Sequence, residues 1–231
     1  MKRAEEPAMH EKAERIKRMK LPGEVSKPGF EHRLPPGQVW TDRFPILHEG
    51  AVPAYDLATW SLRMFGELKE EKTLTHRDLM ALPQTRITCD IHCVTRWSKA
   101  DTVWEGVLVR DVLGLLDVNP EAGYVMVHAD HDYETNVPLK DLLGDQAMLA
   151  HSYDGKPLTP KHGWPFRLLV PHLYFWKSAK WVRGFEFMKE DRTGFWENNG
   201  FHNEADPFKE ERFSGEPLPL PEDEWVHKDF D

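Results

Sequence analysis

Short runs in which apolar and polar residues alternate recur along the chain from residue 57 to residue 188. A period of two is typical of strands with one buried face, and it extends through Thr85–Cys93, where the letters read TRITCDIHC. Apolar residues three and four apart instead indicate amphipathic helices. These patterns predict strands at 59–68, 85–93, 124–128, 133–137, 147–153, 166–170 and 180–187, and helices at 75–82, 107–116 and 139–143.

Turn and cap signals delimit some of these elements. We expect Thr73 or Thr75 to cap the first helix, because a threonine hydroxyl accepts hydrogen bonds from the free amide groups at a helix start. The dipeptide Asp154-Gly155 is expected to join strand 147–153 to strand 166–170. Strands and helices alternate without a regular strand–helix–strand rhythm, so we predict an α+β domain with mixed β-sheets and short helices.

The two ends of the chain depart from this pattern. Residues 1–20 are polar and predict a frayed helix or a disordered tail, whereas residues 21–53 are rich in proline and glycine and predict an extended segment across the domain surface. Residues 1–20 are also basic and residues 204–231 are acidic. We therefore interpret both ends as solvated rather than buried.

Composition narrows the class of protein. With 231 residues, of which 40% are hydrophobic, the chain can form one good-sized domain or two small ones. The net charge of −9 argues against nucleic acid as the main partner. The sequence contains neither a GxGxxG nor a P-loop pattern, so it gives no support for nucleotide binding.

The sequence also predicts a cytoplasmic protein without a membrane span. No apolar stretch follows the first basic residues, so we expect no export signal. The longest apolar stretch, 164–176, is interrupted by prolines and charged residues and does not suit a span. The two cysteines, Cys89 and Cys93, fit a reducing compartment and do not suggest a disulfide framework.

Cys93 is the first candidate for chemistry, because it ends a predicted strand. Its thiolate would suit a transition metal, and Arg96 nearby would lower the thiol pKa and could hold an oxyanion. The alternative is a small buried hydrophobic residue at a strand end, which local composition favours. A zinc site formed by Cys89, His92 and Cys93 is a weaker alternative, because the sequence lacks a second ligand pair.

Three further segments carry candidate binding residues. The loop HGWPFR at 162–167 is fixed by a proline and a glycine, and together with Lys180 it suits an anionic group such as a phosphate; the alternative is a basic surface loop. The pair His48-Glu49 could bind a polar group, although a histidine in a loop is more often solvated. Residues 194–203 crowd aromatics, amides and glycines, which fits a pocket-lining loop or a cover on the domain.

Three motifs occur in order along the chain, CVTRWS at 93–98, HGWPFR at 162–167 and AKW at 179–181. Together they resemble the molybdopterin-binding domain of the sulfite oxidase family, most closely the short bacterial sulfite-oxidase-like proteins and the catalytic subunit of methionine sulfoxide reductase. The resemblance implies a molybdenum–molybdopterin cofactor and the transfer of an oxygen atom or two electrons. It also implies a flexible tail at 1–34, a molybdopterin-binding domain at 35–213 and an acidic tail at 214–231.

The resemblance implies a role for each matching residue. Cys93 matches the cysteine that ligates the metal, with Arg96 beside it as a second catalytic group. The cofactor is a dithiolene with a terminal phosphate, so it needs cations and backbone donors. The implied cofactor-binding residues are His48, Glu49, Cys93, Ala129, His162, Arg167, Ser178, Ala179 and Lys180, and the implied pocket residues are Arg96, Trp97, Trp104 and Phe201.

Two departures from the family pattern bear on the substrate. Sulfite oxidases carry a tyrosine near the metal where this chain places Phe201, and a phenyl ring cannot donate a hydrogen bond. Arg96 alone follows Cys93 where sulfite oxidases have two arginines, so the smaller positive field should bind the sulfite dianion less well. A reductase of S-oxides or N-oxides is therefore an alternative to a sulfite-type oxidase.

The resemblance also bears on partners. We expect a small-molecule substrate that is a sulfur or nitrogen oxo compound, and a separate electron donor or acceptor. We predict a monomer, because the chain shows no segment matching the domain through which sulfite oxidases dimerise. A non-catalytic cofactor-binding module that acts through a partner is the remaining alternative.

Overall fold

Two β-sheets and a few short helices form the fold, in a computed structural model that describes residues 25–48 and 50–214. The strands are β1 (Val39–Trp40), β2 (Ser61–Gly66), β3 (Lys72–Thr75), β4 (Thr85–His92), β5 (Trp97–Leu108), β6 (Tyr124–Ala129), β7 (Glu134–Pro138), β8 (Met148–Tyr153), β9 (Lys156–Pro157), β10 (Arg167–Leu169) and β11 (Val182–Met188). The helices are α2 (His76–Ala81), α3 (Val109–Leu113), α4 (Leu139–Leu142), α5 (Phe195–Asn198) and three 3-10 turns, η1 (Glu31–Arg33), η2 (Pro160–His162) and η3 (Phe175–Lys177).

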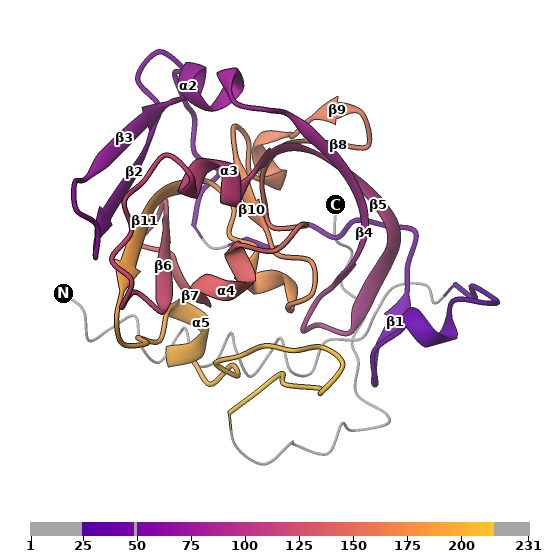
Figure 1. The fold of residues 1–231 in the computed structure, drawn as a ribbon. Helices are drawn as coiled ribbons and strands as arrows, with labels where there is room; N and C mark the ends of the chain where they lie inside the picture. Colours follow the sequence, from indigo (N-terminus) through magenta and orange to yellow (C-terminus); the bar gives the residue numbers. More distant parts are fainter. Residues whose placement is uncertain (1–24, 49, 215–231) are drawn as a thin grey trace.

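The sheets are mixed, which confirms the predicted α+β class. One sheet has the order β3-β2-β11-β6-β7, and the other has the order β1-β5-β8-β10, with β4 paired to β5 and β9 paired to β8 (Figure 1). Strands β2 and β11 are parallel, as are β1 and β5, and the remaining pairs are antiparallel.

The helix predicted at 75–82 is confirmed as α2, and its start has a clear physical cause. The Thr75 hydroxyl accepts from the Asp78 N–H, and the Asp78 carboxylate accepts from the Thr75 N–H. This reciprocal capping box satisfies two amide groups that a helix start otherwise leaves free. Of the two residues expected to cap the helix, Thr75 is therefore the one that does.

Some predicted boundaries were wrong. The long strand β5 went unpredicted, and residues 107–108 belong to it, so the helix predicted at 107–116 begins only at Val109. The turn at Asp154-Gly155 joins β8 to β9 and does not lead directly to β10. Strand β10 instead pairs with β8 after the loop that contains η2.

The segment between β10 and β11 passes from one sheet to the other. Strand β10 belongs to the six-stranded sheet and β11 to the five-stranded sheet, so residues 170–181 cross between them. This crossover carries η3 and the predicted binding residues 178–180. The site therefore has its cations where the two sheets meet.

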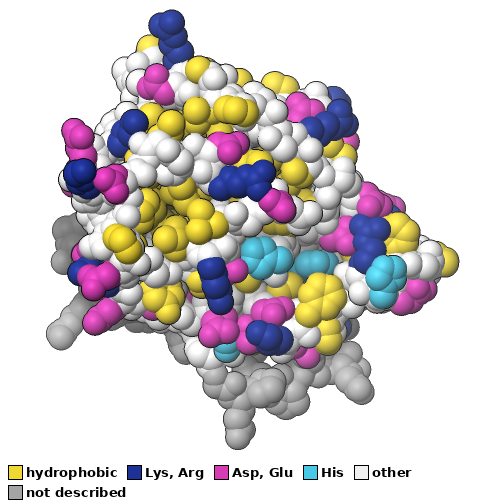
Figure 2. All heavy atoms as spheres, in the orientation of Figure 1, with side chains coloured by type: hydrophobic (Ala, Val, Ile, Leu, Met, Phe, Trp, Pro, Cys, Tyr) yellow, Lys and Arg dark blue, Asp and Glu magenta, His cyan; other side chains and the backbone are white. Residues whose placement is uncertain are grey.

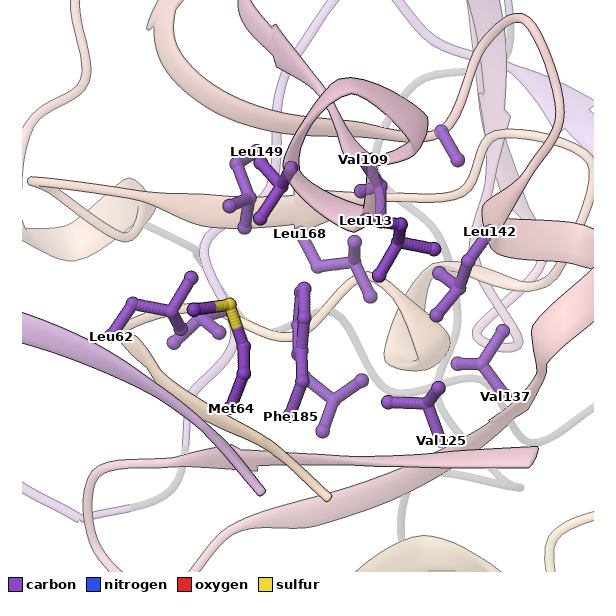
Figure 3. Close-up of a cluster of buried hydrophobic side chains, with 14 of the residues drawn as sticks. Leu62, Met64, Val109, Leu113, Val125, Val137, Leu142, Leu149, Leu168 and Phe185 are labelled. Carbon is purple, nitrogen blue, oxygen red and sulfur yellow. The ribbon is translucent and has the colours of Figure 1, made fainter. Parts of the chain in front are cut away.

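The main hydrophobic core lies between the two sheets. Figure 3 shows its side chains pointing toward one another from β2, β6, β7 and β11 on one side and from β8, β10 and α3 on the other. A second cluster contains Cys93 and most of the buried aromatic rings near it. The tryptophans and the tyrosine of this second cluster bring polar ring atoms close to Cys93.

The described parts of the two ends agree only in part with the prediction. Residues 25–48 contain the turn η1 and the two-residue strand β1 between irregular stretches, whereas the tail predicted at 1–20 lies outside the described residues. Residues 204–214 are not uniformly solvated, because Ala205 and Arg212 are buried. On the face shown in Figure 2, acidic and basic side chains are interspersed with hydrophobic ones between them. Among the described helices, none has the length and apolar character needed to cross a bilayer.

Candidate functional site

Cys93 lies in the tight turn that connects β4 to β5. The Arg96 N–H donates to the Cys93 carbonyl and the Cys93 N–H donates to the Trp97 carbonyl, each at 2.9 Å. Arg96 has a φ of +75°, which residues other than glycine rarely adopt. The turn fixes the Cys93 Sγ, which accepts a hydrogen bond from the Thr95 hydroxyl at 3.1 Å. Strand β4 ends at His92, one residue before the end of the strand predicted at 85–93.

The N-terminal segment holds this turn from outside. Gln38 Nε2 lies 3.1 Å from each of the carbonyl oxygens of Cys93 and Trp97. The predicted catalytic residue Arg96 donates from Nε to the Gly37 carbonyl at 2.9 Å, so it is engaged with the same segment. Gln38 gave no signal in the sequence, because it lies in a stretch rich in proline and glycine.

Arg212 is a buried cation near Cys93 that the sequence reasoning missed. It is 5% exposed, and it donates hydrogen bonds of 2.9 Å to the carbonyls of Val94 and Pro36. Burial raises the pKa of the Cys93 thiol, against the lowering effects of the Thr95 hydroxyl and of the Arg212 and Lys180 charges. The charges of Arg212 and Lys180 therefore favour the thiolate form of Cys93, the effect that the sequence had suggested for Arg96.

Arg167 is a second buried cation, and it is 1% exposed. Its Nη1 and Nη2 donate to the carbonyls of His162 and Ser178, at 3.1 and 2.8 Å, and its Nε is buried without a hydrogen-bond partner in the described part of the chain. Within residues 25–48 and 50–214 it forms no ion pair with a carboxylate. Burial lowers its pKa to about 9, so it still carries a charge at neutral pH. A buried charge without a counter-ion favours an anionic ligand.

His162 and Gly163 bring the loop against this arginine. The Thr159 hydroxyl lies 2.8 Å from His162 Nδ1, and Nε2 is buried without a partner among the described residues. Burial and the charges of Arg167 and Lys180 lower the pKa of His162 to about 4, so the ring is neutral. Gly163 has a φ of +107°, and a Cβ there would lie 3.0 Å from Arg167 Cβ and 3.1 Å from Lys180 Cβ. Glycine is needed for this close approach.

Lys180 completes a group of two cations and a histidine. Its Nζ donates to the carbonyls of Leu47 and Lys161, at 2.7 and 2.8 Å. Burial, and then the charge of Arg167, lowers its pKa to about 7. An anion placed here would restore its charge, because an opposite charge favours the protonated form.

The N-terminal residues 44–48 lie over this group. The Phe44 ring centroid is 4.6 Å from that of His162, and the exposed His48 ring is 5.7 Å from Trp181. Glu49, predicted beside His48, lies outside the described residues. The predicted His48 is therefore near the Lys180 end of the site rather than near Cys93.

The remaining predicted binding residues lie in the backbone segments next to Arg167 and Lys180. The Ser178 hydroxyl accepts from the Val170 N–H at 2.9 Å and its carbonyl holds Arg167, so its side chain has a structural partner. The Ala179 carbonyl accepts from Leu168 at 2.8 Å. Ala129, at the end of β6, pairs with Val182 two residues after Lys180.

Aromatic rings connect the Cys93 turn to Arg167. Trp97, Trp104 and Phe201 belong to the same buried cluster as Cys93. The Arg167 guanidinium lies 5.5 Å from the Trp104 ring and 4.3 Å from the Phe175 ring, and Phe175 is 6.1 Å from Trp97. Trp97, Trp104 and Phe201 were predicted as pocket residues, and in the structure they lie in one cluster with Cys93.

Buried donors without partners show whether a molybdopterin fits. Among the described residues they include Arg167 Nε, His162 Nε2, Trp97 Nε1 and the Tyr174 hydroxyl. His162 Nε2 is a donor when the Thr159 hydroxyl donates to Nδ1. The unpaired guanidinium suits a phosphate and the Cys93 thiol suits a soft metal, so the residues present fit the cofactor. No group of three or more His, Cys, Asp or Glu in the described ranges could hold a metal ion, which leaves the zinc alternative without support.

Comparison with known proteins gives a consistent result. The profile described as "Oxidoreductase molybdopterin binding domain" matches residues 49–196. The chain is 48% identical over 183 residues to "Uncharacterized oxidoreductase YuiH" of Bacillus subtilis, which covers 79% of the chain and 92% of YuiH. It is 25% identical over 175 residues to the protein-methionine-sulfoxide reductase catalytic subunit MsrP of Campylobacter jejuni, which covers 66% of the chain and 59% of MsrP. The fold resembles that of the sulfane dehydrogenase SoxCD from Paracoccus pantotrophus, with a TM-score of 0.58 and 19% identity over 78% of this chain and 52% of SoxCD.

Proposed function

The chain belongs to the oxidoreductase molybdopterin-binding domain family, and from that premise we propose that Cys93 ligates molybdenum and that a small sulfur or nitrogen oxo compound reacts there. The family, the enzyme class and the cofactor predicted from the three motifs are thereby confirmed. The observation that carries the proposed site is Arg167, a buried guanidinium without a carboxylate among the described residues. Such a charge requires an anion, and the phosphate of molybdopterin supplies one.

The residues divide between the two ends of the cofactor. We assign Arg167, Lys180 and the neutral His162 to the phosphate end, because their donors lie together around Gly163. We assign Cys93 to the metal, because the turn and the Thr95 hydroxyl fix its Sγ. When bound, the cofactor supplies a metal that changes its oxidation state by two electrons.

The rest of the chemistry belongs to the protein. The rings of Trp97, Trp104 and Phe201 exclude water from the Cys93 side, because all three are nearly or fully buried. Arg212 and Gln38 hold the turn from two distant segments, which keeps the thiol in one orientation. A fixed ligand orientation reduces the reorganisation needed during reaction.

Metal and pterin analysis tests this proposal. Protein expressed in a host that makes molybdopterin should contain about one molybdenum and one pterin per chain. Cys93→Ser should abolish turnover while the circular dichroism spectrum stays unchanged, and Cys89→Ser is the matched control because Cys89 lies in the same cluster. Wild-type protein without molybdenum and pterin, or a Cys93→Ser variant with full activity, would contradict the assignment.

A reductase of S-oxides or N-oxides is the form of this activity that the site favours. Arg96 and Arg212 both donate to backbone carbonyls, and Phe201 has no hydroxyl, so these three residues do not supply the donors expected for a dianion such as sulfite. The relative MsrP is a catalytic subunit of a protein-methionine-sulfoxide reductase. Steady-state assays with dimethyl sulfoxide, trimethylamine N-oxide and sulfite, using viologen donors and ferricyanide, separate the two directions. A loaded protein that turns over none of them would favour a non-catalytic module.

We also propose a cytoplasmic monomer that exchanges electrons with a separate partner. The two cysteines are free and buried, which suits a reducing compartment. Cell fractionation tests the location, and light scattering of the loaded protein tests the oligomeric state. Recovery of the protein in the periplasm, or a stable dimer at micromolar concentration, would contradict this proposal.

A further inference from the structure

Two buried donors in the cluster around Cys93 have no hydrogen-bond partner among the described residues. They are the Tyr174 hydroxyl and the Trp97 Nε1. Other polar ring atoms of the cluster are satisfied, since Trp104 Nε1 donates to the Thr102 hydroxyl and Trp176 Nε1 donates to Glu197, each at 2.8 Å. Among the described residues, Trp60 Nε1 in the main core also lacks a partner, so what distinguishes the Tyr174 and Trp97 donors is that they lie in the cluster that contains Cys93.

Tyr174 is held rigidly in this cluster. It is 0% exposed, its N–H donates to the Ala205 carbonyl at 2.8 Å, and its ring stacks on Trp176 with centroids 5.4 Å apart. The Arg212 guanidinium lies 5.0 Å from the ring centroid. The same guanidinium donates to the carbonyl of Val94, the residue after Cys93. One side chain thus connects the Tyr174 ring to the Cys93 turn.

The hydroxyl has no evident structural use. A phenylalanine would make the same stacking contacts, and a buried hydroxyl without an acceptor costs free energy. Tyrosine hydroxyls usually find a partner when they are buried. The acceptor is therefore expected to come from a molecule that binds on the Cys93 side.

We propose that the Tyr174 hydroxyl donates a hydrogen bond to the oxygen atom of the substrate, and that Arg212 positions Tyr174 for this contact. The proposal rests on the proposed function, because the substrate binds at the same site. It names the substrate class more closely, as a neutral compound with a polarised oxygen such as an S-oxide or N-oxide. The Tyr174 hydroxyl supplies a hydrogen bond that the ring of Phe201 cannot donate. Tyr174 lies in the crossover between β10 and β11.

Arg212 acts through Tyr174 and does not bind the substrate. Its Nη1 and Nη2 are engaged with the carbonyls of Val94 and Pro36, and its Nε lies 3.3 Å from the Glu210 carboxylate. These contacts leave the face of the guanidinium against the tyrosine ring. Arg212 lies beyond residues 49–196, which the family profile matches, so this positioning contact belongs to the C-terminal segment of this chain.

Tyr174→Phe in the cofactor-loaded protein tests the proposal. We expect molybdenum and pterin contents equal to wild type, a KM for dimethyl sulfoxide and trimethylamine N-oxide about tenfold higher, and a smaller change in kcat. Calorimetric titration with dimethyl sulfone, an analogue that is difficult to reduce, should show binding about tenfold weaker. Tyr153→Phe, which removes a half-buried hydroxyl from the same aromatic cluster, should match wild type in every measurement.

Arg212→Lys tests the positioning role. We expect the same rise in KM. The KM of the double variant with Tyr174→Phe should lie within about a factor of two of that of Tyr174→Phe alone, because both changes remove the same contact with the substrate. Independent, multiplicative effects would overturn the positioning role. If Arg212→Lys does not retain the cofactor, Tyr174→Phe decides the proposal by itself.

The outcomes separate this proposal from the proposed function. A fully loaded Tyr174→Phe variant with wild-type KM and wild-type sulfone binding overturns the role of Tyr174 and leaves the proposed function standing. Loss of cofactor from Tyr174→Phe also overturns it, because the hydroxyl would then be structural. Wild-type protein that contains no cofactor, or that is loaded and inert toward all three substrates, instead contradicts the proposed function.

Discussion

The Nζ of Lys177 lies 2.7 Å from the Oε1 of Glu197, and the two side chains are 0% and 1% exposed. Lys177 also donates to the backbone carbonyl and the side-chain oxygen of Asn136, at 2.8 and 2.9 Å. The pair ties the crossover segment to α5 immediately before the binding residues 178–180. Stability of the fold and placement of the site are therefore linked at this point.

Breaking this pair should be costly. Lys177→Met should lower the free energy of unfolding by about 3–5 kcal/mol, because it leaves a buried carboxylate without its cation. The double variant with Glu197→Leu should regain only part of that loss, because it removes the unpaired carboxylate but leaves Trp176 Nε1 without its acceptor. Urea denaturation measures both, and Lys189→Met is the control, because its pair with Glu121 is exposed and should contribute less than about 1 kcal/mol. Equal losses for the buried and exposed pairs would contradict this prediction.

The strands with clear alternation could be predicted from the sequence, and the longest strand could not. Strand β5 contains Lys99, Asp101 and Glu105, which are poor strand formers, and Asp101 has a φ of +54° that breaks the alternation. Its pairing with both β4 and β8 stabilises it nonetheless. A strand that depends on its neighbours leaves little local signal.

The same distinction applies to the site. Arg167 and Lys180 could be predicted because they lie in the motifs HGWPFR and AKW, which match the family pattern. Arg212 and Gln38 could not, because each lies in a polar or Pro-rich stretch and becomes buried only through contacts with the Cys93 turn. Backbone carbonyls hold both residues, and the sequence does not show which carbonyls a fold leaves accessible.

The neutral His162 predicts acid sensitivity of the cofactor-free protein. Its pKa is about 4 in the fold and 6.5 in its ordinary state, so between these values the unfolded chain binds a proton that the folded chain does not. The free energy of unfolding should therefore fall as the pH drops from 6.5 to 4, by up to about 1.4 kcal/mol per pH unit from this group.

His162→Gln should make that decline less steep. Urea denaturation of the cofactor-free protein at several pH values between 7 and 4 measures the slope. His172→Gln is the control for removing an imidazole, because His172 lies half exposed beside Asp141. A His162→Gln variant with the wild-type slope would show that this ring does not cause the acid sensitivity.

Arg167 should be required for cofactor retention but not for folding. Arg167→Met should lower the pterin content at least tenfold after gel filtration, because charge-assisted hydrogen bonds contribute about 1.5–3 kcal/mol and about 1.4 kcal/mol corresponds to a factor of ten. Arg183→Met is the matched control, since that guanidinium lies 5.5 Å from the Trp60 ring and should lose about 1 kcal/mol of cation–π contact at most. Pterin fluorescence per protein chain measures both variants.

The cofactor-free forms separate a binding role from a structural one. Arg167 is a buried charge without a carboxylate among the described residues, so its replacement by an apolar side chain of similar length removes an unfavourable charge. The cofactor-free Arg167→Met variant should therefore melt no lower than cofactor-free wild type. Equal pterin content in Arg167→Met and Arg183→Met would contradict the binding role. A lower melting temperature of the cofactor-free variant would instead show that the guanidinium holds the carbonyls of His162 and Ser178 chiefly for the fold.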